Sequence, residues 1–161
     1  MKKGINVHLM KVLESAKEPM MADVAFQRSN YNRIISYTSL ARNNLPIAEA
    51  LLIARMWALE GWAEMQMGNQ DKAVSNYTEA FQLDPSVFRR LGISLPVQFS
   101  ISNNEFMSYV GEALEASPRF HESSPGFRLS ISGEESNMQI CLLGTSSEQL
   151  SCVYAPSRTK K

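Results

Sequence analysis

The chain contains few of the residues on which metal and acid–base chemistry usually depends. Only two histidines and two cysteines occur among its 161 residues. His8 lies near the N-terminus and His121 lies in the polar stretch "RFHESS", and neither has a cysteine, serine or acidic partner at a spacing that supports a mechanism. The sequence has neither a phosphate-binding glycine loop nor residues at metal-ligand spacing. We therefore expect no catalytic site, no metal and no cofactor, and we do not expect an enzyme.

The chain also has no excess of charge of either sign. Its 16 Lys and Arg residues balance 16 Asp and Glu residues, so the formal net charge is zero. Nucleic-acid binding needs basic residues gathered on one face, and we therefore do not expect it. The most apolar stretch, residues 47–67, contains charged side chains that a membrane-spanning helix would not tolerate. They are Glu49, Arg55, Glu60 and Glu64.

The N-terminus begins with two lysines and a few apolar residues, as export signals do. The apolar part is too short, and His8 and Lys11 interrupt it. Two alternatives stay open: the protein is cytoplasmic, or an export signal has been removed and the protein is periplasmic or envelope-associated. We expect residues 1–18 to form an N-terminal helix or tail and residues 156–161 to form a solvated basic tail.

Apolar residues recur at helical spacing in the first half of the chain and predict five helices. The first spans residues 5–17. Pro19 is expected to open a second helix that runs to about residue 28, because proline suits the first turn of a helix. The remaining helices are predicted over about residues 31–43, 46–67 and 70–83. The fourth is apolar on more than one side, so we expect neighbours to pack on both sides of it.

Small residues mark the last two of these helices. If the two helices fold back on each other, Gly61 faces Ala73, and Ala80 lets the next element approach. The rings of Trp57 and Tyr77 then fill the wider parts of the interface. The marked positions are, in order, Trp57, Gly61, Gly68, Ala73, Tyr77, Ala80 and Pro85. This pattern resembles the tetratricopeptide repeat, a helix–turn–helix unit of about 34 residues, and it implies a helical repeat domain over residues 19–92.

A second, degenerate copy of the pattern lies upstream. Residues 29–41 align with residues 68–80 at an offset of 39 residues, and Ser29 stands where the better copy has Gly68. Because this offset exceeds the repeat length of the family, we expect about one extra turn at the start of the fourth helix. Two repeats fall short of the three that a stable solenoid needs, so another element should cap the stack.

Beyond residue 95 the pattern changes to short apolar runs separated by Ser, Gly and Asn turns. "LPVQFSI", residues 95–101, alternates as a strand, and a helix capped by Asn103 follows and ends at Ser117. A short strand in "RFHESS" and three strands with tight turns complete a domain over residues 95–155. We therefore predict an α+β chain, with N-terminal helical hairpins followed by a small strand–helix–antiparallel-sheet module that has one wet face and the helix laid on the sheet.

The register of the final hairpin follows from the character of its residues. A turn centred on residues 146–147 pairs residues of like character across the two strands. The pairs are Ile140 with Val153, Leu143 with Leu150, and Cys141 with Cys152. The cysteine pair can form a cross-strand disulfide, which would imply an oxidising compartment. The alternative is that both cysteines are small, buried free thiols.

The string from "SPRF" through "FRLSISGEESNMQICLLGTSSEQLSC" resembles a sheet module of bacterial envelope lipoproteins, such as curli-secretion channel components and penicillin-binding-protein activators. The resemblance covers about residues 95–155. It rests on a helix that ends in a small-Pro-Arg-Phe turn, followed by a β-meander that ends in a hairpin. It implies a role at the bacterial envelope.

The tetratricopeptide resemblance also implies a protein-binding face. In that family the first helix of each repeat lines a concave surface, and Arg, Trp and Met are residues that anchor interfaces. Carried over by position, the surface consists of Arg55, Ala58, Trp62, Met65 and Gln66 from the better copy and Asp23, Phe26 and Gln27 from the degenerate copy. The alternative is that Trp62 and Met65 are buried against the first helix or the sheet module.

These observations favour a non-enzymatic interaction scaffold that acts in a multiprotein assembly, at the bacterial envelope. The alternative is a cytoplasmic repeat protein that acts as a chaperone or adaptor. In either case the expected partner is another protein or a peptide, and self-association of the chain stays open.

Overall fold

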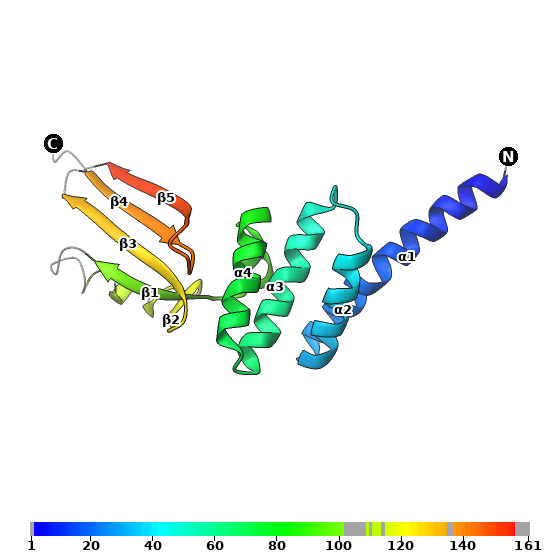
Figure 1. The fold of residues 1–161 in the computed structure, drawn as a ribbon, viewed down its shortest axis with the longest axis horizontal. Helices are drawn as coiled ribbons and strands as arrows, with labels where there is room; N and C mark the ends of the chain where they lie inside the picture. The colour runs from blue at the N-terminus through cyan, green and yellow to red at the C-terminus, as the bar shows by residue number, and fades with distance from the viewer. Residues whose placement is uncertain (1, 102–108, 110, 114, 135–136, 157–161) are drawn as a thin grey trace. The chain divides into compact units, whose positions relative to one another are not determined.

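The computed structural model describes residues 2–101, 109, 111–113, 115–134 and 137–156. Helices occupy the N-terminal half and a five-stranded sheet follows, so the chain is α+β, as expected (Figure 1). The chain divides into two compact units, Met1–Val87 (unit 1) and Phe88–Lys161 (unit 2). Within the described ranges, no helix is both long enough and apolar enough to cross a bilayer.

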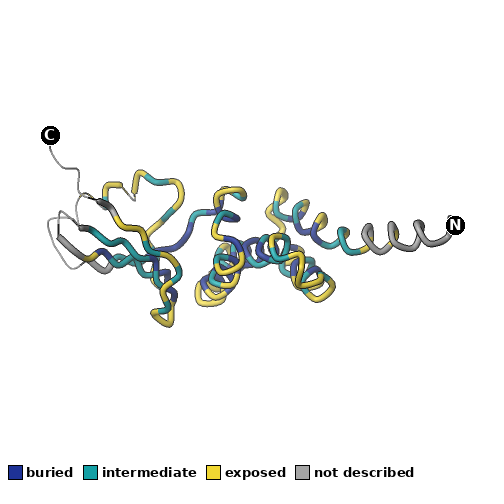
Figure 2. The backbone as a smooth tube through the Cα atoms, turned by 90° about the horizontal axis from the view of Figure 1, so that it is seen from above, coloured by how far each residue is buried: buried dark blue, intermediate teal, exposed yellow. Residues whose placement is uncertain are grey.

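Unit 1 is an array of four helices arranged as two hairpins (Figure 1). Each helix packs against the next one in the sequence, and the first also touches the third. The buried stretches lie where the helices face one another (Figure 2). The helices are α1 (Lys2–Gln27), α2 (Tyr31–Asn44), α3 (Ala50–Gln66) and α4 (Gln70–Leu83), and the short α5 (Val87–Leu91) follows at the division between the units.

Pro19 does not divide the first helix, and the expected break there is wrong. The helix α1 runs without interruption from Lys2 to Gln27 with Pro19 inside it. Proline removes one backbone hydrogen bond from a helix interior. Pro19, Ala22 and Ala25 are all buried, because this half of α1 packs against α2. Pro19 therefore lies inside the helix, in the part that packs against α2.

The two hairpins turn in the same way, at positions 39 residues apart. Ser29 and Gly68, which align in the sequence, both have a positive φ, of 50° and 85°. The backbone N–H of each next residue then donates to the carbonyl five residues before it. These bonds are Asn30 to Ala25 and Asn69 to Glu64, both 2.9 Å long. Each turn thus satisfies carbonyls at a helix end with one residue in the left-handed region.

The expected extra turn at the start of α3 is wrong. Residues 45–49 instead form the connection between the hairpins, and α3 begins at Ala50. Pro46 restricts the residue before it to extended backbone, and Leu45 has φ −77° and ψ 136°. Glu49 then donates its backbone N–H to the carbonyl of Pro46 at 2.9 Å, which closes a turn ahead of the helix.

Gly61 allows α3 and α4 to approach each other closely. A Cβ atom at Gly61 would lie 2.5 Å from Cδ1 of Tyr77 and 3.1 Å from the carbonyl oxygen of Ala73. Tyr77 is 1% exposed, so its ring has no free space into which it can move. The expected approach of Gly61 to the helix of Ala73 is therefore confirmed. Tyr77, however, lies directly on Gly61 and does not fill a wider part of the interface.

Replacing Gly61 by alanine is expected to lower the free energy of unfolding of unit 1 by about 1–3 kcal/mol, the usual cost of overpacking a core. Alanine stabilises a helix by up to about 1 kcal/mol relative to glycine, and the expected net loss already takes this gain into account. Denaturant unfolding followed by tryptophan fluorescence measures it, because both tryptophans, Trp57 and Trp62, lie in unit 1.

Gly111→Ala is the matched control, because an added Cβ at this helical position meets no described atom within 4 Å. A Gly61→Ala/Tyr77→Leu double variant should recover part of the loss, since leucine replaces the ring that obstructs the new methyl group. Equal stability of Gly61→Ala and the wild type would show that the two helices can separate at no cost.

Unit 2 contains a mixed sheet with the strand order β2-β1-β3-β4-β5. The strands are β1 (Leu95–Ile101), β2 (Phe120–Glu122), β3 (Phe127–Glu134), β4 (Asn137–Leu143) and β5 (Gln149–Pro156). The strand positions agree with the sequence, but the expected antiparallel sheet is wrong at one side, because β1 pairs in parallel with both β2 and β3. The antiparallel pairing holds for β3, β4 and β5.

The parallel arrangement requires the chain to cross β1 between β2 and β3. Val97 pairs with Glu122 on one side and with Phe127 on the other, so the crossing takes place over residues 123–126. Ser123 donates its backbone N–H to the carbonyl of Val97 at 3.0 Å. A Cβ at Gly126 would lie 2.7 Å from the carbonyl oxygen of Ser123 and 3.0 Å from that of Pro96. Glycine is therefore needed at 126 because backbone approaches backbone there.

The predicted helix from Asn103 to Ser117 lies largely outside the described residues, and so does its expected place on the sheet. Residues 109, 111–113 and 115 are helical. On the sheet itself, Val97, Phe127 and Ile131 are buried on one face, whereas Ser130 is half-buried and Ser132 exposed on the other. The expected difference between the two faces is therefore present in β3.

The hairpin of β4 and β5 has the predicted register at its centre. Cys141 pairs with Cys152 and Ile140 pairs with Val153. The predicted pairing of Leu143 with Leu150 is wrong, because a bulge after Leu142 brings Leu143 opposite Gln149. The turn uses Ser147 at φ 68°. The bulge shifts one strand by one residue near the turn, and the matched pairs farther from the turn stay unchanged.

Candidate protein-binding face

Three aromatic rings from three helices meet on one side of unit 1. The rings of Phe26 in α1 and Trp62 in α3 lie edge to face, with centroids 4.7 Å apart. Tyr31, at the start of α2, meets Trp62 in a similar way, with centroids 5.5 Å apart. All three side chains are half-buried. This geometry is the favourable one for aromatic pairs, and it leaves part of each ring open to a partner.

An ion pair lies beside the rings. Both Nε and Nη2 of Arg55 in α3 lie 2.8 Å from Oδ1 of Asp23 in α1. The two side chains are 32% and 34% exposed, so solvent screens the pair and its contribution to stability is small. The pair joins the same two helices that hold Phe26 and Trp62, and it therefore helps to fix the spacing of those rings.

The structure brings most of the predicted binding residues together on α1 and α3. Met65 is half-buried, and Gln27 and Gln66 are exposed. Ala58 is fully buried, so its expected place on the binding surface is wrong: its methyl group can contact only residues of the folded chain. We use the name α1–α3 face for Asp23, Phe26, Gln27, Tyr31, Arg55, Trp62, Met65 and Gln66.

Sequence reasoning did not identify Tyr31 as a member of this face. The residue lies directly after Asn30, whose side-chain oxygen accepts the backbone N–H of Arg33 at 3.3 Å and caps α2. The tight turn at Ser29 then brings the first residue of α2 beside α3. Periodicity in the sequence does not mark Tyr31 as a member of this face. Its place directly after the capping residue Asn30 could have marked it.

Behind this face, a buried carboxylate links three helices. Glu60 in α3 accepts hydrogen bonds from Thr38 and Arg42 in α2, at 2.9 and 2.5 Å, and its other oxygen lies 3.4 Å from the amide nitrogen of Asn76 in α4. Its side chain is 6% exposed, and that of Arg42 is 13% exposed. The guanidinium of Arg42 also stacks on the ring of Trp57, 3.6 Å from its centroid. This network fixes α2 and α4 against α3.

A second buried carboxylate lies one turn farther along α3. Glu64 forms an ion pair with Lys72 in α4 and accepts a hydrogen bond from the side-chain amide of Asn69 at 2.7 Å. The two interactions join both sides of the Gly68 turn. In the sequence, Glu60 and Glu64 interrupt an apolar helix. The structure shows that both carboxylates are buried and ion-paired, Glu60 with the largely buried Arg42 and Glu64 with the exposed Lys72.

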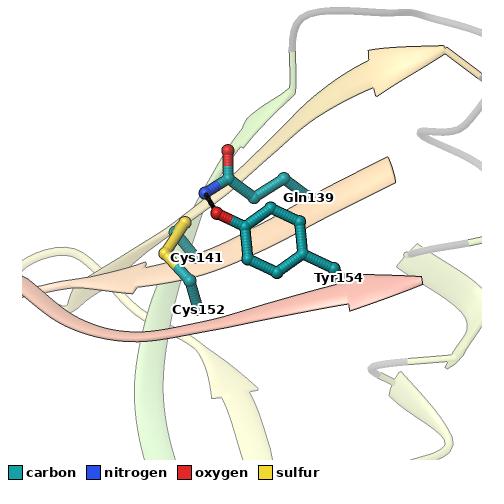
Figure 3. The surroundings of a disulfide bond; sticks show 4 residues. All are labelled: Gln139, Cys141, Cys152 and Tyr154. Carbon is teal, nitrogen blue, oxygen red and sulfur yellow. Dashed lines mark hydrogen bonds between the residues drawn. A yellow bond between two sulfur atoms is a disulfide. The ribbon is translucent and has the colours of Figure 1, made fainter. Parts of the chain in front are cut away.

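In unit 2, Cys141 of β4 and Cys152 of β5 are joined by a disulfide across the two strands, with Cα atoms 4.1 Å apart (Figure 3). Gln139 and Tyr154 lie beside it, and the amide nitrogen of Gln139 donates to the Tyr154 hydroxyl at 3.2 Å. All four residues belong to one face of the sheet, because they alternate along paired strands. The disulfide ties the edge strand β5 to the rest of the sheet.

The second half of the chain also contains His121, in β2. Its Nδ1 lies 2.9 Å from the hydroxyl oxygen of Ser94. Partial desolvation lowers the pKa of this histidine below its ordinary value, which favours the neutral imidazole. Across the described ranges, no three His, Cys, Asp or Glu side chains gather closely enough to hold a metal ion.

A scan against protein-family models, a search of curated proteins and a search of solved structures each found no match to this chain. Its function must therefore be inferred from its own residues.

Proposed function

We propose that this protein is a non-enzymatic scaffold of a multiprotein assembly, and that it binds a segment of another protein on the α1–α3 face of tetratricopeptide-like helices. The observation that carries the proposal is the meeting of Phe26, Tyr31 and Trp62, three half-buried rings supplied by three helices. Tryptophan and tyrosine dominate the energetics of protein interfaces, above all when neighbouring residues already hold the rings in place.

The surroundings of the rings suit a peptide partner. Arg55 and Asp23 neutralise each other, so an incoming apolar side chain meets no isolated charge. Met65 adds a flexible apolar surface that adapts to different side chains. Exposed Gln27 and Gln66 supply amide groups at the rim, where they can bond to a partner backbone.

The disulfide supports an envelope location for this scaffold. Disulfides persist in the bacterial periplasm and are rare in the cytosol, where thiols stay reduced. A cytoplasmic adaptor is the alternative. Alkylation of protein taken directly from its native compartment separates the two: protected Cys141 and Cys152 place the chain in the envelope, and alkylated thiols place it in the cytosol.

Replacing Trp62 by alanine is expected to reduce capture of the partner from native extract by at least about tenfold, because a buried aromatic anchor contributes about 2 kcal/mol or more to binding. Trp62→Phe keeps a ring against Phe26 and should keep part of the capture. Tyr154→Ala is the matched control, since it removes an exposed ring from unit 2. Circular dichroism must first show that each variant is folded.

A folded Trp62→Ala variant that captures the same partner as the wild type would overturn the proposal. If Trp62→Ala does not fold, Met65→Glu tests the same face, because this half-buried side chain has room to carry a charge to solvent. Binding can also be measured directly, since the emission of Trp62 should shift to shorter wavelength when a partner covers it in a Trp57→Phe background.

A further inference from the structure

One side of α1 carries apolar side chains that are exposed in the part of the chain that the structure describes. Met10 is 55% exposed, Met20 66%, Met21 37% and Val24 40%. The three methionines, together with Glu14 and Lys17, line a shallow depression of about 370 Å³. Four exposed apolar side chains on one helix are more than the scattered single residues that a monomer surface normally shows.

These residues follow the spacing of a coiled coil. Met10, Glu14, Lys17, Met21 and Val24 are separated alternately by four and three residues, which places them in one stripe along the helix. The stripe is exposed, whereas Ala22 and Ala25 of the same helix are buried inside unit 1. It also excludes Asp23 and Phe26, so it is separate from the α1–α3 face.

The order of residue types along the stripe is nearly the same in both directions. If a second α1 lies antiparallel with the two-fold axis between residues 15 and 16, each residue i meets residue 31 − i of the other copy. Met10 then meets Met21 of the second copy, and Glu14 meets Lys17 of the second copy. One apolar layer therefore lies at each end of two central layers of opposite charges.

We propose that α1 forms an antiparallel two-helix interface with α1 of a second copy of this chain. Such an interface is self-complementary, as two-fold symmetry requires. The charges select the partner and its direction: a parallel pair would set Glu14 against Glu14 and Lys17 against Lys17, whereas the antiparallel pair forms two Glu–Lys contacts. The resulting dimer carries two α1–α3 faces, each of them complete within one copy.

The described residues of the stripe that meet one another set the length of the interface. They span residues 10–21, about 18 Å of helix at 1.5 Å per residue. Because each copy contributes only one helix face, the buried area lies at the small end of the range of protein interfaces. We therefore expect the association to be reversible.

Charge exchange tests this geometry. Glu14→Lys sets two lysines against the two lysines of the other copy, and Lys17→Glu does the same with glutamates, so each variant alone should associate at least about tenfold more weakly than the wild type. An equimolar mixture of the two variants should form a heterodimer, because every charged pair is then opposite in sign. The Glu14→Lys/Lys17→Glu double variant should dimerise like the wild type.

Sedimentation velocity and light scattering on the full chain measure the result, from about 10 µM to on the order of 0.5 mM, since a single-helix interface associates weakly. Glu79→Lys, an exposed charge reversal on α4, is the control for net charge and should leave dimerisation unchanged. A wild type that stays monomeric over this range overturns the proposal. Dimerisation of Glu14→Lys at wild-type strength also overturns it, because the interface would then lie elsewhere.

Discussion

Replacing Glu60 by leucine is expected to lower the free energy of unfolding of unit 1 by about 3–5 kcal/mol, the cost of removing one partner from a buried ion pair. The substitution leaves the guanidinium of Arg42 at 13% exposure without its carboxylate. It also removes the acceptor for the hydroxyl of Thr38 and for the side-chain amide of Asn76. Denaturant unfolding followed by tryptophan fluorescence and circular dichroism measures the loss.

Glu79→Leu makes the same chemical change at an exposed position of α4 and should alter stability by no more than about 0.5 kcal/mol. Because a loss of this size approaches the total stability of a small unit, Glu60→Gln provides a milder variant that keeps the shape of the side chain. If Glu60→Leu costs no more than Glu79→Leu, the network does not hold α2 and α4 against α3.

The double variant Arg42→Leu/Glu60→Leu separates the ion pair from the burial of its members. Replacing both partners of a buried pair by apolar residues is often neutral or stabilising, so the double variant should be more stable than Glu60→Leu alone. Part of the loss will remain, because the guanidinium of Arg42 also stacks on Trp57. The stability change of the double variant minus the sum of the changes in Arg42→Leu and Glu60→Leu gives the interaction energy of the pair directly.

The sequence predicts the local structure of this chain well, because local structure depends on neighbouring residues. Helices α2 and α4 and all five strands lie close to their predicted positions. The pairing of Cys141 with Cys152 follows from matching residues across one hairpin. The repeat offset of 39 residues is visible in the alignment of Ser29 with Gly68, and both residues have a positive φ.

Features that depend on distant residues could not be predicted in this way. Alternation along β1 shows which residues share a face but does not show which strand pairs with it, so the parallel neighbours were missed. The sequence does not show the path of the chain between β2 and β3, and only the structure shows the backbone crossing at Gly126. Glu60 was judged by its charge alone, whereas its partner Arg42 lies 18 residues away.

The same reasoning applies to the candidate site. Trp62 and Phe26 were identified from the tetratricopeptide resemblance, which assigned both to one face of their helices, and their rings are in contact. Ala58 was assigned to the surface by position alone, but it is fully buried because α3 is covered on more than one side. Position in a repeat therefore predicts which helix face a residue occupies better than it predicts exposure.

Reduction of the disulfide is expected to destabilise the β4–β5 hairpin by about 3 kcal/mol, the chain-entropy estimate for a cross-link between residues 11 apart. Among the described strands, β5 lies at the edge of the sheet and pairs with β4 alone, so it should open first. Hydrogen exchange measured on peptides of the full chain should therefore become about 100-fold faster in β4 and β5. Peptides from α3 and α4 should not change.

A Cys141→Ala/Cys152→Ala variant is the control, because a reductant should have no further effect on it. Unchanged exchange in β5 after complete reduction would show that the bond adds nothing to strand pairing. Fast exchange confined to the hairpin would instead mean that the sheet of unit 2 is fully formed only where thiols are oxidised. The ion-pair network that holds unit 1 together does not depend on redox conditions. The redox state of the compartment would then control the sheet of unit 2 and leave the α1–α3 face intact.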